Sequence, residues 1–171
     1  LVYNDGTLVS AGTRGDGTVG ENVLESILLL ASIPKELPEE FKELKLVRGE
    51  AIIPRRNHKK MKELGYEAMR NAVPGIVRSC NEKALPYVDF VAYEFFDGEV
   101  SRLTQRNRYN SLFKVEEFDY YENDSFQDIL AKREFYSANK DIYKYEIDGV
   151  VLKTVNKLRD DLLNPIHQIA W

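Results

Sequence analysis

The chain has 171 residues, of which 43% are hydrophobic and 30% charged, and its formal net charge is −4. This balance excludes an intrinsically disordered chain and allows one domain with a buried core. A single cysteine, Cys80, excludes an internal disulfide, and the apolar runs are far shorter than the ~20 residues of a membrane-spanning helix. We therefore expect a monomeric globular protein of a reducing compartment, the cytoplasm, without a membrane partner.

The first half of the sequence predicts a hairpin, a glycine-rich loop, a helix and a strand. Residues 1–3 and 8–11 flank an Asp5-Gly6 turn, because Asp-Gly accepts the positive φ angles of tight hairpin turns. Residues 12–20 follow as the glycine-rich loop, the helical spacing covers residues 23–28, and the strand covers residues 46–53.

The next elements are short. Asn57 is expected to cap a helix that ends at Gly65. Residues 71–80 are ambiguous, since Pro74 should limit any helix there.

The second half alternates strands and helices. The predicted elements are a central strand at 88–96, a helix at 103–113, a helix from Ser125 to Tyr136 with a capping box at Asp128, a buried strand at 146–153 and a short polar helix near 156–162. This order predicts an α+β fold of antiparallel sheets flanked by helices.

The strand at 146–153 carries charges at both ends of an apolar run. Asp148 and Lys153 would point to opposite faces of a regular strand, unless a bulge at Gly149 redirects one of them. The stretch is either an edge strand with solvated ends or a site for a charged ligand.

The glycine-rich loop and the strand at 46–53 each allow two interpretations. Four glycines around Arg14 can cradle an anion or form a flexible hairpin exit. Arg48 and Glu50 share one face of their strand, either as a salt bridge or as an arginine that holds a carboxylate for a ribose hydroxyl.

Three further residues are candidates for nucleotide or phosphate contacts. Arg70 and Arg78 flank a Pro/Gly stretch, and the planar guanidinium suits phosphate oxygens. Tyr93 is either a core residue or a stacking surface for a base.

Taken in order, these motifs resemble the adenylation (nucleotidyltransferase) domain of NAD-dependent DNA ligases. The resemblance covers essentially the whole chain, and its first element is specific to the NAD-dependent branch. The matching stretches are residues 13–17 (Thr-Arg-Gly-Asp-Gly), 20–23, 47–50, Arg70-Asn71-Ala72 with Gly75 and Arg78, Tyr93, Thr104-Gln105 before a helix, and 148–153 (Asp-Gly-Val-Val-Leu-Lys).

The resemblance implies a nucleotidyltransferase (ATP-grasp-like) fold, with residues 1–171 forming an adenylation domain that is incomplete at both ends. It implies that Glu50 holds the adenosine ribose, that Tyr93 stacks on adenine, and that Lys153 contacts the nucleotide. Arg14 would serve the nucleotide and the end of the nick. The implied reaction is the sealing of nicked duplex DNA with NAD, at the nucleoid or a viral replication site.

It also implies a metal and phosphate contacts. Asp148 would position Mg²⁺, and Arg70 and Arg78 would grip DNA phosphates or the transferring phosphate. Lys140 stands where the family has an arginine, so the charge is kept but the bidentate geometry is lost.

The chain departs from the family in its nucleophile, because no Lys-x-Asp-Gly occurs in it. We expect that lysine just upstream of Leu1, and a final phosphate-contacting lysine just after Trp171. Ile166-His167 in place of Arg-Trp, and Val73-Pro74 in an alanine-rich run, indicate a divergent member.

The chain alone should not adenylate itself. Two alternatives stay open: a degenerate module that binds nicked DNA or a replication partner without catalysis, and an ATP-dependent or capping-type enzyme.

Overall fold

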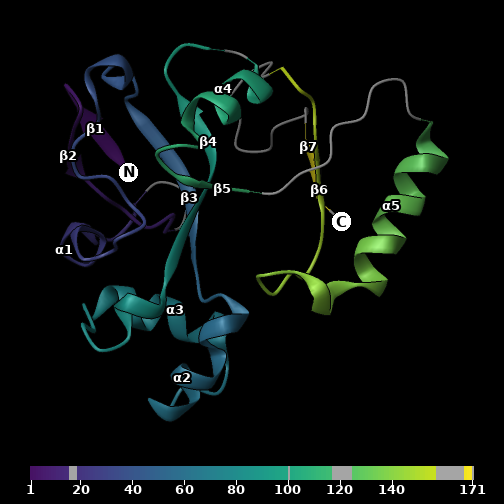
Figure 1. Ribbon diagram of the computed structural model, residues 1–171, viewed down its shortest axis with the longest axis horizontal. Helices are drawn as coiled ribbons and strands as arrows, with labels where there is room; N and C mark the ends of the chain where they lie inside the picture. Colours follow the sequence, from purple (N-terminus) through teal and green to yellow (C-terminus); the bar gives the residue numbers. More distant parts are fainter. Residues whose placement is uncertain (16–18, 100, 117–124, 157–167, 171) are drawn as a thin grey trace.

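The computed structural model describes residues 1–15, 19–99, 101–116 and 125–156, and the backbone of 168–170. One five-stranded sheet forms the body of the protein, and a two-stranded sheet and a long helix lie to one side of it (Figure 1). Within the described residues, no helix has both the length and the apolar character needed to cross a membrane.

The elements alternate along the chain. The strands are β1 (Val2–Asn4), β2 (Thr7–Ser10), β3 (Leu46–Ile52), β4 (Asp89–Phe96), β5 (Lys114–Val115), β6 (Val151–Lys153) and β7 (Gln168–Ala170). The α-helices are α1 (Leu24–Leu28), α2 (His58–Glu63), α3 (Met69–Arg78), α4 (Arg102–Tyr109) and α5 (Phe126–Ala138). The 3₁₀ turns are η1 (Glu39–Phe41), η2 (Arg55–Asn57), η3 (Leu85–Tyr87) and η4 (Lys140–Ile142).

The main sheet has the order β2-β1-β3-β4-β5, and β6 pairs with β7 in the second sheet. Most neighbouring strands are antiparallel, as predicted, and β4 is central as predicted. The pair of β4 with β5 is parallel, which contradicts the expectation of purely antiparallel sheets. The helix α4 between these two strands supplies the crossover that a parallel pair requires. The mixed architecture agrees with an α+β fold.

A β-bulge in β4 shapes the face of the sheet that carries the predicted site. Arg48 lies opposite Glu94 and Gly49 lies opposite Ala92, so Tyr93 has no residue opposite it on β3. Ala92 and Phe95 are buried although they are three residues apart, which an uninterrupted alternation would not allow. The bulge therefore places both Tyr93 and Glu94 on the outer face, beside Arg48 and Glu50.

Apolar side chains on the other face of the sheet form the core with α1, α3 and α4. Aromatic rings gather there, with Phe95 stacked on Tyr109 at 4.7 Å between ring centroids and Phe113 edge-on to Tyr3 at 6.2 Å. The helix α3 contributes Met69, Val73, Ile76 and Val77, all buried. This core fixes β3, α3 and β4, which carry Glu50, Arg70, Arg78 and Tyr93, half of the predicted site residues.

Several predicted elements are confirmed. The hairpin forms with Asp5 and Gly6 at positive φ, and the short helix α2 is followed by Gly65 at positive φ. Ser125 caps α5 through a capping box with Asp128, as predicted.

Two expectations about the helical region were wrong. Pro74 lies inside α3, because the burial of four apolar side chains outweighs the ~3 kcal/mol cost of a proline in a helix interior. Asn57 makes no side-chain capping bond to α2, since its amide donates to the carbonyl oxygen of Tyr87 at 2.9 Å.

The predicted strand at 146–153 is mostly not a strand. Only Val151–Lys153 pairs, and Val151 and Leu152 are 53% and 37% exposed, so the expectation of a buried strand was wrong. The helix predicted at 103–113 is α4, which ends at Tyr109. Thr104 and Gln105 lie inside this helix, whereas the family resemblance had placed them before it. The polar helix predicted near 156–162 lies outside the described residues.

Candidate functional site

Tyr93 and Lys153 meet on the outer face of the sheet. The Nζ atom of Lys153 lies 5.0 Å from the centre of the Tyr93 ring, a distance typical of a cation–π contact. Tyr93 is 38% exposed, so part of its side chain is accessible to a ligand. The contact depends on the β4 bulge, which turns Tyr93 outward.

Glu116, directly after β5, is the carboxylate partner of Lys153. Its Oε1 atom lies 3.5 Å from Nζ. Burial raises the pKa of Glu116, and the positive charge of Lys153 counteracts that rise in part. The sequence did not reveal this partner, because a contact between residues 37 positions apart leaves no local signal.

Glu50 lies on the same outer face. It is exposed, and its charge contributes to the raised pKa of Arg70, after the larger effect of Asp148. The pKa of Tyr93 is raised mainly by burial and by Glu94, and Glu50 adds to that rise. Glu50 therefore acts electrostatically on both Tyr93 and Arg70.

Arg48 does not pair with Glu50. Its Nη1 atom lies 3.1 Å from Glu94, which also accepts a bond of 3.2 Å from Arg102. The salt-bridge interpretation of Arg48 and Glu50 was therefore wrong, and Glu94, which the sequence did not reveal as a partner, takes both arginines.

Arg70 forms an ion pair with Asp148. The bond from Arg70 lowers the pKa of Asp148, burial opposes this, and the charge of Lys140 contributes to the lowering. Because Gly149 and Val150 are not in a strand, the backbone can carry Asp148 to α3 and Lys153 to Tyr93, so strand parity does not apply.

Among the described residues, Asp148 is the one predicted metal ligand, and no cluster of further ligands surrounds it. No group of three or more His, Cys, Asp or Glu side chains gathers among them. Mg²⁺ often binds through one or two carboxylates and substrate phosphates, so one aspartate fits only if a substrate supplies further oxygens. Arg70 holds that aspartate, and a metal ion would have to displace it.

Arg78 and Arg14 lie elsewhere. Arg78 ends α3 and pairs with Glu21 at 2.5 Å, while Arg70 is near the start of the same helix. The Thr13 hydroxyl accepts from the backbone N–H of Glu21 at 3.0 Å, so Arg78 joins the glycine-rich loop that carries the exposed Arg14. A Cβ on Gly20 would lie 3.0 Å from the carbonyl carbon of Thr13, so this glycine allows the loop to close. Residues 16–18 of the loop lie outside the described residues.

The structure thus forms two pairs, Tyr93 with Lys153 and Arg70 with Asp148. Glu50 acts electrostatically on Tyr93 and Arg70, and Lys140 acts on Asp148. Arg78 pairs instead with Glu21, beside the loop that carries Arg14.

The chain is similar to known proteins over nearly its whole length. A family model described as NAD-dependent DNA ligase adenylation domain matches residues 1–162. The chain is 31% identical to a DNA ligase of Shouchella clausii over 94% of the chain and 25% of that protein. It is 32% identical to a DNA ligase of Borrelia hermsii over 100% of the chain and 27% of the relative.

The chain thus spans about a quarter of the length of these relatives. The match over nearly all of its residues means that the chain belongs to the NAD-dependent DNA ligase adenylation domain family.

Proposed function

We propose that this chain binds the adenylate part of NAD and works in a protein that seals nicks in duplex DNA. The convergence of Glu50, Tyr93 and Lys153, which come from three different strands, carries the proposal. An aromatic face, a lysine and a carboxylate are the groups that can stack on adenine, meet a phosphate or ring nitrogen, and accept from a ribose hydroxyl. We infer a nucleotidyltransferase fold over residues 1–171, acting as a monomer.

In the proposed reaction, an active-site lysine attacks NAD to give lysyl-AMP and nicotinamide mononucleotide. The AMP then passes to the 5′-phosphate of the nick, and the 3′-hydroxyl displaces it. A lysine nucleophile splits one difficult step into easier ones. Mg²⁺ would neutralise charge on the phosphoryl groups, and Asp148 is the residue that would hold it. In this scheme Arg14, Arg70 and Arg78 meet phosphates of the nucleotide or of DNA.

Nucleotide binding is tested by titrating AMP into the chain and its variants by calorimetry. Tyr93→Ala should weaken binding by about 5- to 150-fold, because base–aromatic stacking contributes about 1–3 kcal/mol per base. Tyr93→Phe keeps the ring and is the matched control, with an affinity close to that of the original chain. Equal affinity of the alanine variant would contradict the stacking role.

Self-adenylation is tested by mixing the chain with NAD labelled in its adenylate part and Mg²⁺. We expect no labelled protein, because the chain contains no Lys-x-Asp-Gly motif. A covalent adduct on any of its lysines would show that another residue takes the place of the nucleophile.

A further inference from the structure

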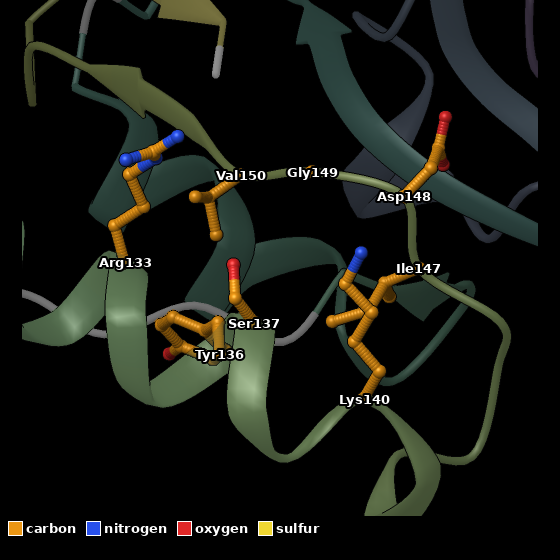
Figure 2. Close-up of a pocket in the computed structure, with 8 residues that line it drawn as sticks. All are labelled: Arg133, Tyr136, Ser137, Lys140, Ile147, Asp148, Gly149 and Val150. Carbon is orange, nitrogen blue, oxygen red and sulfur yellow. The ribbon is translucent and has the colours of Figure 1, made fainter.

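A cavity of about 210 Å³ lies between the last turns of α5 and the backbone that leads into β6 (Figure 2). Its lining residues are Arg133, Tyr136, Ser137, Lys140, Ile147, Asp148, Gly149 and Val150. Pockets for whole organic ligands usually measure about 300–1,000 Å³, so this cavity suits a smaller group.

Arg133, Ser137 and Lys140 supply polar groups to the cavity. Arg133 and Ser137 are four residues apart on one face of α5, and Lys140 follows in η4. In Figure 2 the Ser137 hydroxyl and the Lys140 ammonium point toward the backbone of residues 147–150. Arg133 stands at the other end of the cavity, near Val150.

The backbone that carries Lys140 is fixed from outside the cavity. The Arg55 guanidinium donates to the carbonyl oxygen of Lys140 at 3.2 Å and to that of Tyr143 at 3.1 Å. The backbone N–H of Arg55 also donates to the carbonyl oxygen of Lys144 at 2.9 Å. The turn after α5 is therefore held in place, which reduces the entropy lost when Lys140 meets a ligand.

The charge of the cavity favours an anion. Among the described residues that line it, Asp148 alone is acidic, and Arg70 already pairs with that carboxylate. Arg133 and Lys140 add two positive charges to the lining, and Ser137 adds a hydroxyl donor. Guanidinium, ammonium and hydroxyl groups together are the donors that phosphate oxygens accept best.

We propose that Arg133, Ser137 and Lys140 form a binding pocket for one phosphate group beside Asp148. The proposal extends the proposed function, since both substrates named there carry phosphates. Arg133 and Ser137 are the new members of the site. The phosphate belongs either to a DNA strand or to the pyrophosphate of NAD.

The test begins with inorganic phosphate added to the 171-residue chain while backbone amide NMR signals are followed. We expect saturable shifts around Ser137 and Gly149. Arg133→Ala should weaken this binding about tenfold, because a charge-assisted hydrogen bond contributes about that factor or more. Lys132→Ala removes a neighbouring exposed charge that does not line the cavity, and it should leave the affinity unchanged.

Competition identifies the source of the phosphate. Displacement by a 5′-phosphorylated nicked duplex, with a salt slope about one unit smaller in Arg133→Ala, assigns the pocket to DNA. Displacement by NAD assigns it to the dinucleotide. No saturable shift at Ser137 and Gly149, or equal affinity in the two alanine variants, would overturn the pocket.

Failure of the pocket is separate from failure of the proposed function. Loss of AMP binding in Tyr93→Ala without any phosphate shift at Ser137 keeps the proposed function and removes the pocket. Phosphate shifts at Ser137 in a chain that binds no AMP would keep the pocket and reject the proposed function.

Discussion

Gly49 allows β3 to pack closely against Phe90 and Val91 of β4. It lies in β3 opposite Ala92, and a Cβ there would stand 2.6 Å from the carbonyl oxygen of Val91 and 2.7 Å from a ring carbon of Phe90. Real Cβ atoms do not approach backbone oxygens that closely. The glycine between Arg48 and Glu50 therefore allows β3 and β4 to meet at the point where the bulge turns Tyr93 outward.

We predict that Gly49→Ala lowers the free energy of unfolding by about 1–3 kcal/mol, the usual cost of overpacking. Gly75→Ala in α3 is the matched control, since a Cβ there meets nothing within 4 Å. Alanine in a helix is favoured over glycine by up to ~1 kcal/mol, so the control should be slightly stabilised. Urea unfolding measures both, and equal midpoints for the two variants would disprove the steric argument.

At this scale the sequence identified candidates but not their partners. The motifs singled out Glu50, Tyr93 and Lys153, which the structure places near one another. Glu116 was missed, because the contact that joins it to Lys153 is formed only by the tertiary fold. Arg133 and Ser137 are one helical turn apart, but the predicted helix ended at Tyr136, and nothing in the sequence linked either residue with Lys140.

The segment that leads to Asp148 is held against the main sheet by one buried carboxylate. Asp89, at the start of β4, accepts from Arg56 at 3.0 Å and from the Tyr145 hydroxyl at 2.9 Å, and pairs with Lys114. Burial tends to raise the pKa of Asp89, but the bonds from Lys114, Tyr145 and Arg56 outweigh it and lower the pKa below its ordinary value of 3.8. One side chain thus connects β4, β5, η2 and the approach to β6.

We predict that Asp89→Asn destabilises the fold by about 1–3 kcal/mol at neutral pH, because it removes the negative charge and replaces one of the two acceptor oxygens by an NH2 donor. A carboxyl group with a lowered folded pKa adds stability above its unfolded pKa, and that stability is lost as the pH falls through the folded pKa. The gap between the original chain and the variant should therefore be constant from pH 7 to 5 and shrink below pH 3.8.

Urea unfolding at several pH values measures this gap. Asp141→Asn is the matched control, because Asp141 is 98% exposed in its ion pair with Arg55 and should change stability little. A gap of the same size at pH 3 and pH 7 would contradict the role of the Asp89 charge.

Elements with strong local signals were predictable. The hairpin, β3, β4 and the capped start of α5 each carry a turn, an apolar run or a capping box. The errors at Pro74 and at residues 146–150 share one cause: tertiary contacts overrode local preference. Burial of one face keeps α3 helical through its proline, and the pairing of Asp148 with Arg70 draws the backbone away from a regular strand.

At the scale of the whole molecule, the alternation of strands and helices predicted the mixed architecture but not the full strand order. The parallel pair of β4 and β5 was missed because β5 has only two residues and no local pattern of its own. The site is assembled by this sheet, since β3, β4 and the end of β5 supply Glu50, Tyr93 and Glu116.

The long connection between β3 and β4 has a consequence for the rate of folding. These strands pair along their whole lengths, yet α2, α3 and the turns around them lie between them in the sequence. Closing so long a loop is slow, because its entropy is lost before the strand contacts form. We infer that this loop is already closed in the transition state for folding, and that the side chains of Glu50 and Tyr93 reach their final positions on the outer face only after it.

AMP should then slow unfolding and leave the folding rate unchanged, since it stabilises contacts that the transition state lacks. Stopped-flow folding and unfolding in urea, with and without AMP, measures both rates, and faster folding with AMP would contradict the late assembly. The nucleotide would prolong the lifetime of the folded chain without changing the rate at which the chain folds.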